Sequence, residues 1–202
     1  MGLGLTLANS QVEILTEFLS LLSRWNRTYR LTAVTDPEDM VARHLLDSLS
    51  VLPYVRGTRV LDVGSGPGLP GIPLAVARPD WQFVLLDSNG KKTRFMTHAA
   101  GRLGLTNVNV IKARVEDYAD DIGFDTVISR AFSSMSDFVR LAGHLCGPGG
   151  GLLAMKGRLR EEELADIPPG WQMVDTPKLV VPGIAGERHL VVLNRDPQLT
   201  DR

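Results

Sequence analysis

Five short apolar runs that alternate with helical stretches constrain the fold of this chain more than any other feature. The apolar runs occupy residues 59–63, 82–87, 108–112, 124–129 and 151–156. Helical character marks the segments near residues 70–78, 90–103, 134–145 and 158–166. Parallel strands need long crossover connections, and a helix is the usual one, so this alternation predicts a mostly parallel sheet with helices on both faces. We therefore expect an α/β fold of the doubly wound, Rossmann-like class.

Two helices are expected before the alternating region. Residues 9–31 have apolar side chains every three or four positions, which predicts an amphipathic helix with Ser10 as its N-cap. A second helix is expected to open at Asp36-Pro37, a cap residue followed by proline, and to run to about residue 53. In this second helix, Arg43 and Asp47 are expected to form a solvated ion pair one turn apart.

The C-terminal part departs from the alternation. Residues 171–195 contain two strand-like runs around the sequence PGIAG, which predicts an antiparallel hairpin at an edge of the sheet. No Gly/Ser linker divides the chain, and the natural boundary falls at residues 56–58. We expect residues 1–56 to form an N-terminal helical extension packed on a core of residues 57–202, as one compact unit.

The composition excludes several classes of protein. The chain has 202 residues, 44% of them hydrophobic, and a net charge of −1, which is typical of a globular domain rather than a basic body that coats nucleic acid. Cys146 is the single cysteine, so a disulfide framework and a Cys-based zinc cluster are excluded. The four histidines form no close ligand pair, and we expect no metal. Without a signal peptide or an apolar run of about 18 residues, a soluble cytoplasmic protein without membrane contact is expected.

The glycine-rich segment Gly64–Gly68 directly follows the first apolar run. A loop after a strand lies at the carboxyl edge of the sheet, where open α/β folds bind ligands, and glycine lets a ligand approach the backbone closely. Residues 66–71 match the dinucleotide pattern G-x-G-x-x-G, but the two prolines in it have no N–H to offer a pyrophosphate. Counted from Gly64, the spacing resembles the cofactor loop of class I S-adenosylmethionine-dependent methyltransferases.

Two carboxylates suit the charge of S-adenosylmethionine. This cofactor has no phosphate but carries an ammonium and a sulfonium group, for which a carboxylate at a strand end is favourable. Asp62 lies just before the glycine loop, and Asp87 closes the second strand, where its carboxylate can accept hydrogen bonds from both ribose hydroxyls. An NAD enzyme would place an acidic residue similarly, so Asp87 alone does not separate the two cofactors.

Further motifs resemble those of one family. They are Arg43-His44-Leu45-Leu46-Asp47-Ser48, Leu86-Asp87-Ser88 followed by Gly90-Lys91-Lys92, Arg114-Val115-Glu116, Ser129-Arg130-Ala131-Phe132, Lys156-Gly157 and Glu187-Arg188-His189-Leu190. In this order, over about residues 25–194, they resemble the bacterial ribosomal RNA small-subunit methyltransferase G family, formerly glucose-inhibited division protein B. The resemblance implies a class I methyltransferase fold, S-adenosylmethionine as the methyl donor, and N7 of one guanine in 16S ribosomal RNA as the acceptor.

The resemblance also implies a set of site residues. The expected cofactor contacts are Gly64, Ser65, Gly66, Leu69, Asp87, Val115, Glu116 and Arg130. Arg130 is further expected to lie between donor and acceptor and to position the reactants, and the alternative is an ion pair with Asp125 or Asp137. The target guanine is expected to stack on Phe132 or on Arg130, and the sequence does not decide between them.

Basic side chains gather in one stretch although the net charge is near zero. From Ser88 to Arg114 the chain has six basic residues and no acidic one: Lys91, Lys92, Arg94, Arg102, Lys112 and Arg114. RNA affinity rests largely on neutralised phosphates. We expect RNA contacts at Lys91, Lys92, Arg94, Arg43, Lys156 and Arg188, with a solvated helix face as the alternative for each. The implied partner is 16S ribosomal RNA, within the small subunit or an assembly intermediate, and a monomeric enzyme is expected.

Three other functions stay open on the residues alone. They are a small-molecule methyltransferase with the N-terminal extension as a lid, an NAD-linked oxidoreductase, and a ligand sensor without chemistry. For the main hypothesis no general base is expected, because guanine N7 has an in-plane lone pair and no proton. Catalysis is then expected to come from alignment and from positioned dipoles.

Overall fold

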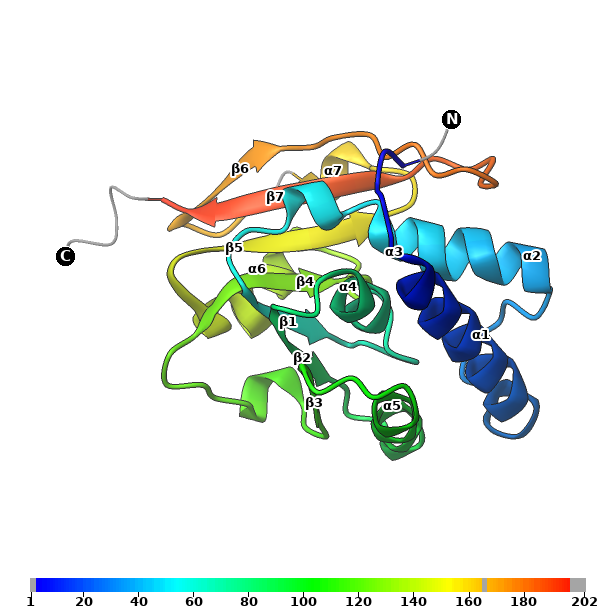
Figure 1. The fold of residues 1–202 in the computed structure, drawn as a ribbon. Helices are drawn as coiled ribbons and strands as arrows, with labels where there is room; N and C mark the ends of the chain where they lie inside the picture. The colour runs from blue at the N-terminus through cyan, green and yellow to red at the C-terminus, as the bar shows by residue number, and fades with distance from the viewer. Residues whose placement is uncertain (1–2, 165–166, 197–202) are drawn as a thin grey trace.

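A seven-stranded sheet forms the centre of the computed structural model, which describes residues 3–164 and 167–196 (Figure 1). The strands are β1 (Arg59–Val63), β2 (Gln82–Leu86), β3 (Val108–Ile111), β4 (Phe124–Ser129), β5 (Cys146–Lys156), β6 (Trp171–Asp175) and β7 (His189–Arg195). Their order in the sheet is β3-β2-β1-β4-β5-β7-β6. The first five strands pair in parallel, and β7 runs antiparallel to both β5 and β6. The expected α/β sheet with an antiparallel edge hairpin is therefore confirmed.

The α-helices follow the expected pattern, with shifts of their ends. They are α1 (Asn9–Tyr29), α2 (Pro37–Met40), α3 (Asp47–Leu49), α4 (Gly71–Ala77), α5 (Gly90–Arg102), α6 (Met135–Ala142) and α7 (Glu161–Leu164). The last strand of the parallel set begins five residues before the expected position. Helix α7 is shorter than the stretch expected near residues 158–166, of which residues 165–166 lie outside the described residues.

The starts of the first two helices show which cap predictions hold. Asp36 caps α2 as expected, since its carboxylate accepts the N–H groups of Glu38 and Asp39 at 3.0 and 3.1 Å. The prediction of Ser10 as the N-cap of α1 is wrong: the helix begins after Ala8, whose N–H donates to the Gln11 side chain at 2.8 Å. A glutamine three positions into the helix replaces the hydroxyl cap.

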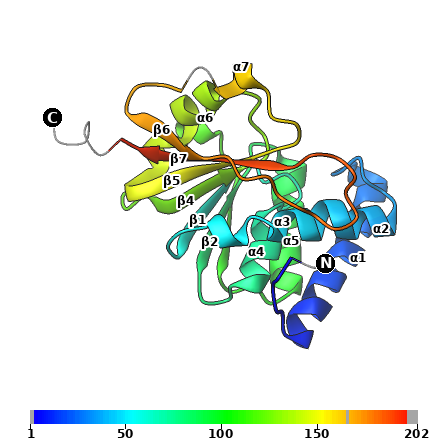
Figure 2. The ribbon, with the colours of Figure 1, turned by 90° about the horizontal axis from the view of Figure 1, so that it is seen from above.

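The two faces of the sheet have separate cores because side chains alternate along each strand. Val60 of β1 and Leu85 of β2 belong to one core, and their neighbours Leu61 and Leu86 belong to the other. The first core includes buried residues of α1, of the helix from α2 to α3, of α4 and of α5. The second core includes α6. Figure 2 shows this arrangement from above, with α6 on the opposite side of the sheet from α4 and α5.

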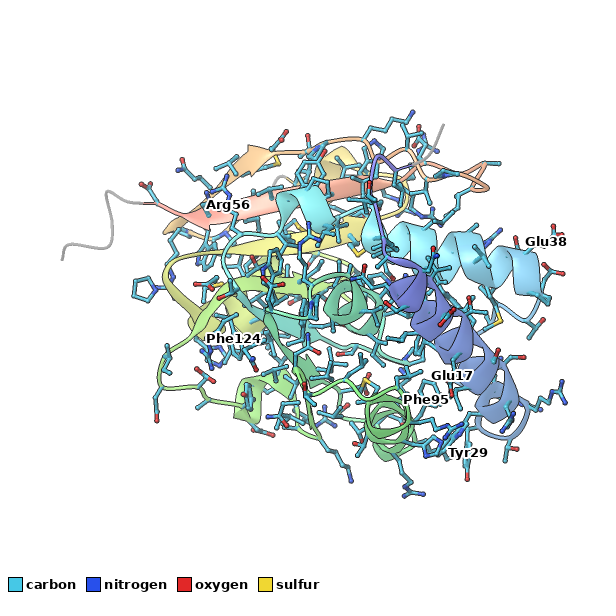
Figure 3. All side chains as sticks on the ribbon, viewed as in Figure 1. Glu17, Tyr29, Glu38, Arg56, Phe95 and Phe124 are labelled. Carbon is cyan, nitrogen blue, oxygen red and sulfur yellow. The ribbon has the colours of Figure 1, made fainter. Side chains whose placement is uncertain are left out.

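The N-terminal helices contribute directly to the first core. Phe18 and Trp25 of α1 pack on Phe95 of α5 with ring centroids 6.2 and 5.5 Å apart. Figure 3 shows Phe95 close to Glu17 and Tyr29 of α1, and the Glu17 carboxylate lies 3.2 Å from the Arg102 guanidinium of α5. Within the described residues, every helix is too short or too polar to cross a membrane.

Candidate active site

The glycine loop joins β1 to α4 and is bound to the end of β2. The N–H groups of Gly64 and Ser65 donate to the Leu86 carbonyl at 2.8 and 3.1 Å, and the N–H of Gly66 donates to Asp87 Oδ2 at 2.9 Å. Gly64 and Gly66 have φ angles of +68° and +59°, where a residue with a Cβ is strained. These bonds use the loop N–H groups that a dinucleotide pyrophosphate would need, which argues against NAD.

A pocket of about 290 Å³ opens at the carboxyl ends of β1, β2, β3 and β4. Its lining residues are Val63, Gly64, Leu86, Asp87, Ser88, Lys92, Ala113, Arg114, Val115, Glu116, Ala131 and Phe132. Gly64 has a further reason to be glycine, since a Cβ there would lie 2.8 Å from the Ala131 Cβ. The glycine loop and the segment after β4 therefore lie in close contact and both line the pocket.

Asp87 has the position and the free acceptor capacity expected of a ribose ligand. Its Oδ1 accepts the N–H of Asn89 at 2.8 Å, and its Oδ2 accepts the N–H of Gly66. A carboxylate offers about four acceptor positions, so acceptor capacity remains toward the pocket. Lys92 Nζ lies 3.8 Å from Asp87 Oδ2 and also lines the pocket.

Asp62, near the end of β1, is hydrogen-bonded to the segment after the glycine loop and does not line the pocket. Its side chain is fully buried, and its Oδ2 accepts the N–H of Gly71 at 2.8 Å. Burial raises the pKa of Asp62 to about 7. The carboxylates that face the pocket are therefore those of Asp87 and Glu116.

The pocket fits S-adenosylmethionine in size and chemistry. Its volume is close to the lower end of the range for small-molecule sites, about 300–1,000 Å³. Apolar side chains such as Val63, Val115 and Phe132 offer a surface for a purine ring, and two carboxylates complement a cationic ligand with ribose hydroxyls.

Comparison with known proteins identifies the family. Residues 11–191 match the family described as rRNA small subunit methyltransferase G. The protein named Ribosomal RNA small subunit methyltransferase G of Alkalilimnicola ehrlichii is 56% identical over 189 residues, which cover 94% of this chain and 86% of the relative. Its namesake of Nitrosococcus oceani is 53% identical over 191 residues, which cover 95% and 89%. The chain belongs to this methyltransferase family.

Solved structures of more distant proteins have the same fold. Magnesium protoporphyrin IX methyltransferase of Synechocystis, with bound S-adenosylmethionine, has a TM-score of 0.62 at 16% identity over 95% of this chain and 99% of that one. TrmN of Thermus thermophilus has a TM-score of 0.59 at 21% identity, over 74% of this chain and 48% of that one. The methyltransferase therefore has the class I fold, and S-adenosylmethionine is the cofactor that fits its pocket.

The predicted cofactor residues of the methyltransferase divide into two groups. Gly64, Asp87, Val115 and Glu116 line the pocket. The remaining four predicted residues, Ser65, Gly66, Leu69 and Arg130, are not among the lining residues.

The reason is the direction in which the loop turns its side chains. Ser65 is buried and its hydroxyl donates to the Asp62 carbonyl at 2.7 Å. Leu69 is only 2% exposed and packs in the first core. Ser65 and Leu69 thus turn their side chains away from the pocket, and contact of Ser65, Gly66 and Leu69 with the cofactor stays a prediction.

Phe132 and Lys156 form one unit at the far wall of the pocket. The Phe132 ring stacks on Phe138 with centroids 4.8 Å apart. Lys156 Nζ donates to the carbonyl groups of Phe132 and Ser133, each at 2.8 Å, and to Glu163 Oε2 at 2.7 Å. An ammonium group has three N–H bonds. Two of these bonds hold the segment after β4 and the third goes to α7, so a phosphate bound at Lys156, as the sequence predicts, would have to replace one of them.

Arg130 and Arg188 share one buried carboxylate. Arg130 Nη1 lies 3.1 Å from Asp47 Oδ2, and Arg188 Nε lies 3.0 Å from Asp47 Oδ1. Asp47 is only 5% exposed, so the expected solvated pair with Arg43 is wrong, and Arg43 instead lies 3.6 Å from Asp39. Packing of α3 against the sheet turns Asp47 inward, where sequence spacing alone placed it in solvent.

The alternative partners expected for Arg130 have other roles. Asp125 accepts the N–H groups of Thr58 and Arg59 at 2.8 Å each, ahead of β1. Asp137 accepts from Arg140 at 2.7 Å on α6. The ion pair of Arg130 therefore joins β4 to the N-terminal helices.

His44 lies buried in the π-helical turn Val41–Leu46 between α2 and α3. Its Nε2 is 3.1 Å from the Thr32 hydroxyl. Burial, with the Arg130 guanidinium nearby, lowers the pKa of His44 to about 4. A histidine that stays neutral at physiological pH next to an arginine avoids a second positive charge in this region.

The basic stretch lies at the pocket mouth and beside it. Lys92 and Arg114 line the pocket, and Lys91 and Arg94 are exposed on the first turns of α5. Arg94 and Lys112 also line a neighbouring groove between α5 and β3. The basic side chains other than Arg102, at the far end of α5, thus gather around one edge of the sheet.

Several pocket residues were missed from the sequence, and their positions carry a readable signal. Ser88, Ala113 and Arg114 directly follow strands whose carboxyl ends form the site. A rule that takes every residue just after a parallel strand would include them. Asp47 has no such signal, since its partners lie 83 and 141 residues away in sequence.

Proposed function

We propose that this methyltransferase transfers a methyl group from S-adenosylmethionine to N7 of a guanine in 16S ribosomal RNA. The observation that carries the proposal is the pocket at the carboxyl edge of the sheet, with Gly64 in one wall and Asp87 at the ribose position, in a chain of this family. The names of the relatives support small-subunit ribosomal RNA as the substrate class.

Four residues of the chain are proposed to hold the cofactor. Asp87 accepts hydrogen bonds from the ribose hydroxyls, and Val115 and Glu116 lie against the adenine. Gly64, which has no side chain, lets the ligand approach the backbone. When bound, S-adenosylmethionine supplies an electrophilic methyl group. The chain then has to exclude water, hold the guanine in line and avoid a positive charge next to the new cation.

The acceptor side of the pocket favours Phe132 over Arg130 as the side chain that contacts the guanine ring. Phe132 lines the pocket, and its ring and backbone are held by Phe138 and Lys156. Arg130 donates to Asp47 at 3.1 Å and is not among the residues that line the pocket. No proton acceptor is proposed, because guanine N7 carries a lone pair and no proton.

The proposed RNA contacts lie around the pocket mouth. Lys91, Lys92 and Arg94 are proposed to contact phosphates from α5, and Arg43, paired with Asp39, and Arg188, paired with Asp47, are proposed to do so from outside α5. The proposed substrate is the small subunit or an assembly intermediate, methylated in the cytoplasm by a monomer. A folded RNA of this kind presents single-stranded bases that can be splayed out into a pocket.

The test is methyl transfer from labelled S-adenosylmethionine to small ribosomal subunits, naked 16S RNA and a panel of small metabolites. We expect label in the RNA, and nucleoside analysis is expected to find it as 7-methylguanosine. Label in a metabolite would favour a small-molecule methyltransferase. Label on N1 or on an exocyclic amine would overturn the N7 assignment.

A further inference from the structure

The ion cluster of Asp47, Arg130 and Arg188 borders a second cavity, of about 160 Å³, next to the cofactor pocket. Its walls come from α3, from the segment after β4, from the end of β5 and from the start of β7, and Figure 1 shows α3 beside the end of β5. Arg130 immediately precedes Ala131 and Phe132, which line the cofactor pocket. The two cavities therefore lie on either side of one short segment.

Both arginines keep unused donors at this cavity. Arg130 Nη1 donates to Asp47 and, at 3.4 Å, to the Arg43 carbonyl, whereas Arg188 donates from Nε to Asp47 and from Nη1 to the Glu187 carbonyl at 2.8 Å. A guanidinium has five N–H groups, so among the described residues each arginine uses two. The side chains are 28% and 24% exposed, which means that they are partly desolvated but reachable.

The charge of the cluster selects an anion. One buried carboxylate between two guanidinium groups leaves an excess positive charge, and Lys156, which also borders the cavity, is neutralised by Glu163 at 2.7 Å. Guanidinium groups bind phosphate oxygens with paired, geometrically fixed hydrogen bonds. Asp47 holds the two guanidinium groups close together against their mutual repulsion, as a binding site for one phosphate requires.

We propose that Asp47 is a positioning residue that holds Arg130 and Arg188 as a clamp on one phosphodiester of the substrate RNA, beside the guanine that enters the cofactor pocket. This inference rests on the proposed function. It adds one specific phosphate site to the basic residues of α5. A phosphate bound by both arginines fixes the position of the nucleotide chain relative to Phe132.

The first test uses Arg188→Gln and Arg188→Lys in the full chain, with KM for small subunits and equilibrium binding of a labelled 16S RNA fragment as readouts. We expect Arg188→Gln to raise KM and the RNA dissociation constant on the order of tenfold, and Arg188→Lys to restore part of the loss. The slope of log affinity against log salt is expected to become shallower by about 0.7 in Arg188→Gln, as one lost phosphate contact with single-stranded RNA requires.

The second test uses the sign of the charge change. Asp47→Asn makes the chain more positive, so simple electrostatics predicts tighter RNA binding, whereas loss of the clamp predicts weaker binding and a higher KM. Asp137→Asn, which makes the same charge change on α6, is the matched control and is expected not to weaken binding. Asp47→Asn combined with Arg188→Gln is expected to be no worse than Arg188→Gln alone, since both remove one clamp.

A third measurement, the affinity for S-adenosylhomocysteine, tests whether the two arginines bind an RNA phosphate or the carboxylate of the cofactor. We expect this affinity to stay within about twofold of wild type in the Arg188 variants, a change too small for a lost charge-assisted hydrogen bond. A large loss of cofactor affinity would overturn the clamp, as would an unchanged salt slope in Arg188→Gln. If Asp47→Asn does not fold, the Arg188 variants decide alone. A wild-type protein that neither binds RNA nor methylates it would instead contradict the proposed function.

Discussion

At the residue scale, Gly64 combines a positive φ with a close neighbour in the pocket wall. Its φ of +68° strains any residue with a Cβ, and the added Cβ would lie 2.8 Å from Ala131. Gly104 has almost the same φ, +67°, but nothing within 4 Å of the added Cβ. The two positions therefore separate backbone strain from closure of the pocket.

We expect Gly64→Ala and Gly104→Ala each to lose roughly 1 kcal/mol of unfolding free energy through the strained φ. Only Gly64→Ala is expected to weaken binding of S-adenosylhomocysteine, on the order of tenfold or more, because the crowded wall must shift. Isothermal calorimetry and chemical denaturation measure the two quantities. Equal cofactor affinity in both variants would remove Gly64 from the site.

His44 makes a separate prediction about acid stability. Its pKa in the folded protein is about 4, below the value of about 6.5 in the unfolded chain. The unfolded state therefore binds more protons as pH falls from 6.5 to 4, and the folded state loses up to about 3 kcal/mol over this window. Above pH 6.5 the histidine is neutral in both states and contributes no pH dependence.

His44→Gln is expected to keep the contact to Thr32 and to lose this acid sensitivity. Denaturant unfolding at pH 7 and pH 4 measures the difference between the variant and wild type. His144→Gln, at an exposed histidine, is the control for the loss of a histidine at a surface position. Parallel pH profiles for wild type and His44→Gln would contradict a buried neutral His44.

At the scale of elements, α5 has different functions at its two ends. The first turns carry Lys91 and Arg94 exposed near the pocket mouth, and Lys92 lines the pocket itself. The last turn carries Arg102, which pairs with Glu17 of α1 at 3.2 Å. The same helix therefore has one basic end beside the pocket, and an ion pair fixes its other end to the N-terminal helix.

Replacing Lys91 and Arg94 together by glutamine is expected to weaken RNA binding and to make the salt slope shallower by about 1.4, as two lost phosphate contacts with single-stranded RNA require. Cofactor affinity is expected to stay unchanged, because Lys92 is left in place. Arg102→Gln is the control on the same helix. A salt slope identical to that of wild type in the double variant would show that these side chains are only solvated.

At the scale of the whole molecule, the site depends on every layer of the fold. The sheet brings four strand ends together, and the glycine loop is hydrogen-bonded to the end of β2. The N-terminal helices contribute the buried His44 and Asp47, which pairs with Arg130. The first core contains residues from α1 through β7, so the N-terminal extension and the sheet share one hydrophobic interior. The geometry that aligns the reactants is therefore a property of the complete chain.

The proposed chemistry predicts a weak pH dependence for the complete enzyme. Single-turnover methyl transfer at saturating RNA and cofactor is expected to be nearly flat from about pH 6 to 8.5, because no proton moves before the methyl group does. Burial raises the pKa of Asp62 to about 7, so its titration would act on cofactor affinity in this pH range. Saturating cofactor removes this effect from the measured rate. A tenfold rise in rate per pH unit would reveal a general base.

The sheet, its edge hairpin and the glycine loop at the end of β1 were all predictable from the sequence. Strand periodicity, the helical stretches and Gly64–Gly68 are local signals, and the rules for parallel sheets convert them into a site at the carboxyl edge. The motif order from Arg43 to Leu190 also identified the family correctly.

Which side chains face the site depends on tertiary packing and could not be predicted from the sequence. Asp47 meets Arg130 and Arg188 across 83 and 141 residues, Lys156 donates to the segment after β4, and Leu69 turns into the core. Such partners are chosen by packing, which brings distant segments together and determines which charges are desolvated. The spacing of four residues between Arg43 and Asp47 does not show that Asp47 pairs with Arg130 and Arg188. These arginines come from distant parts of the chain.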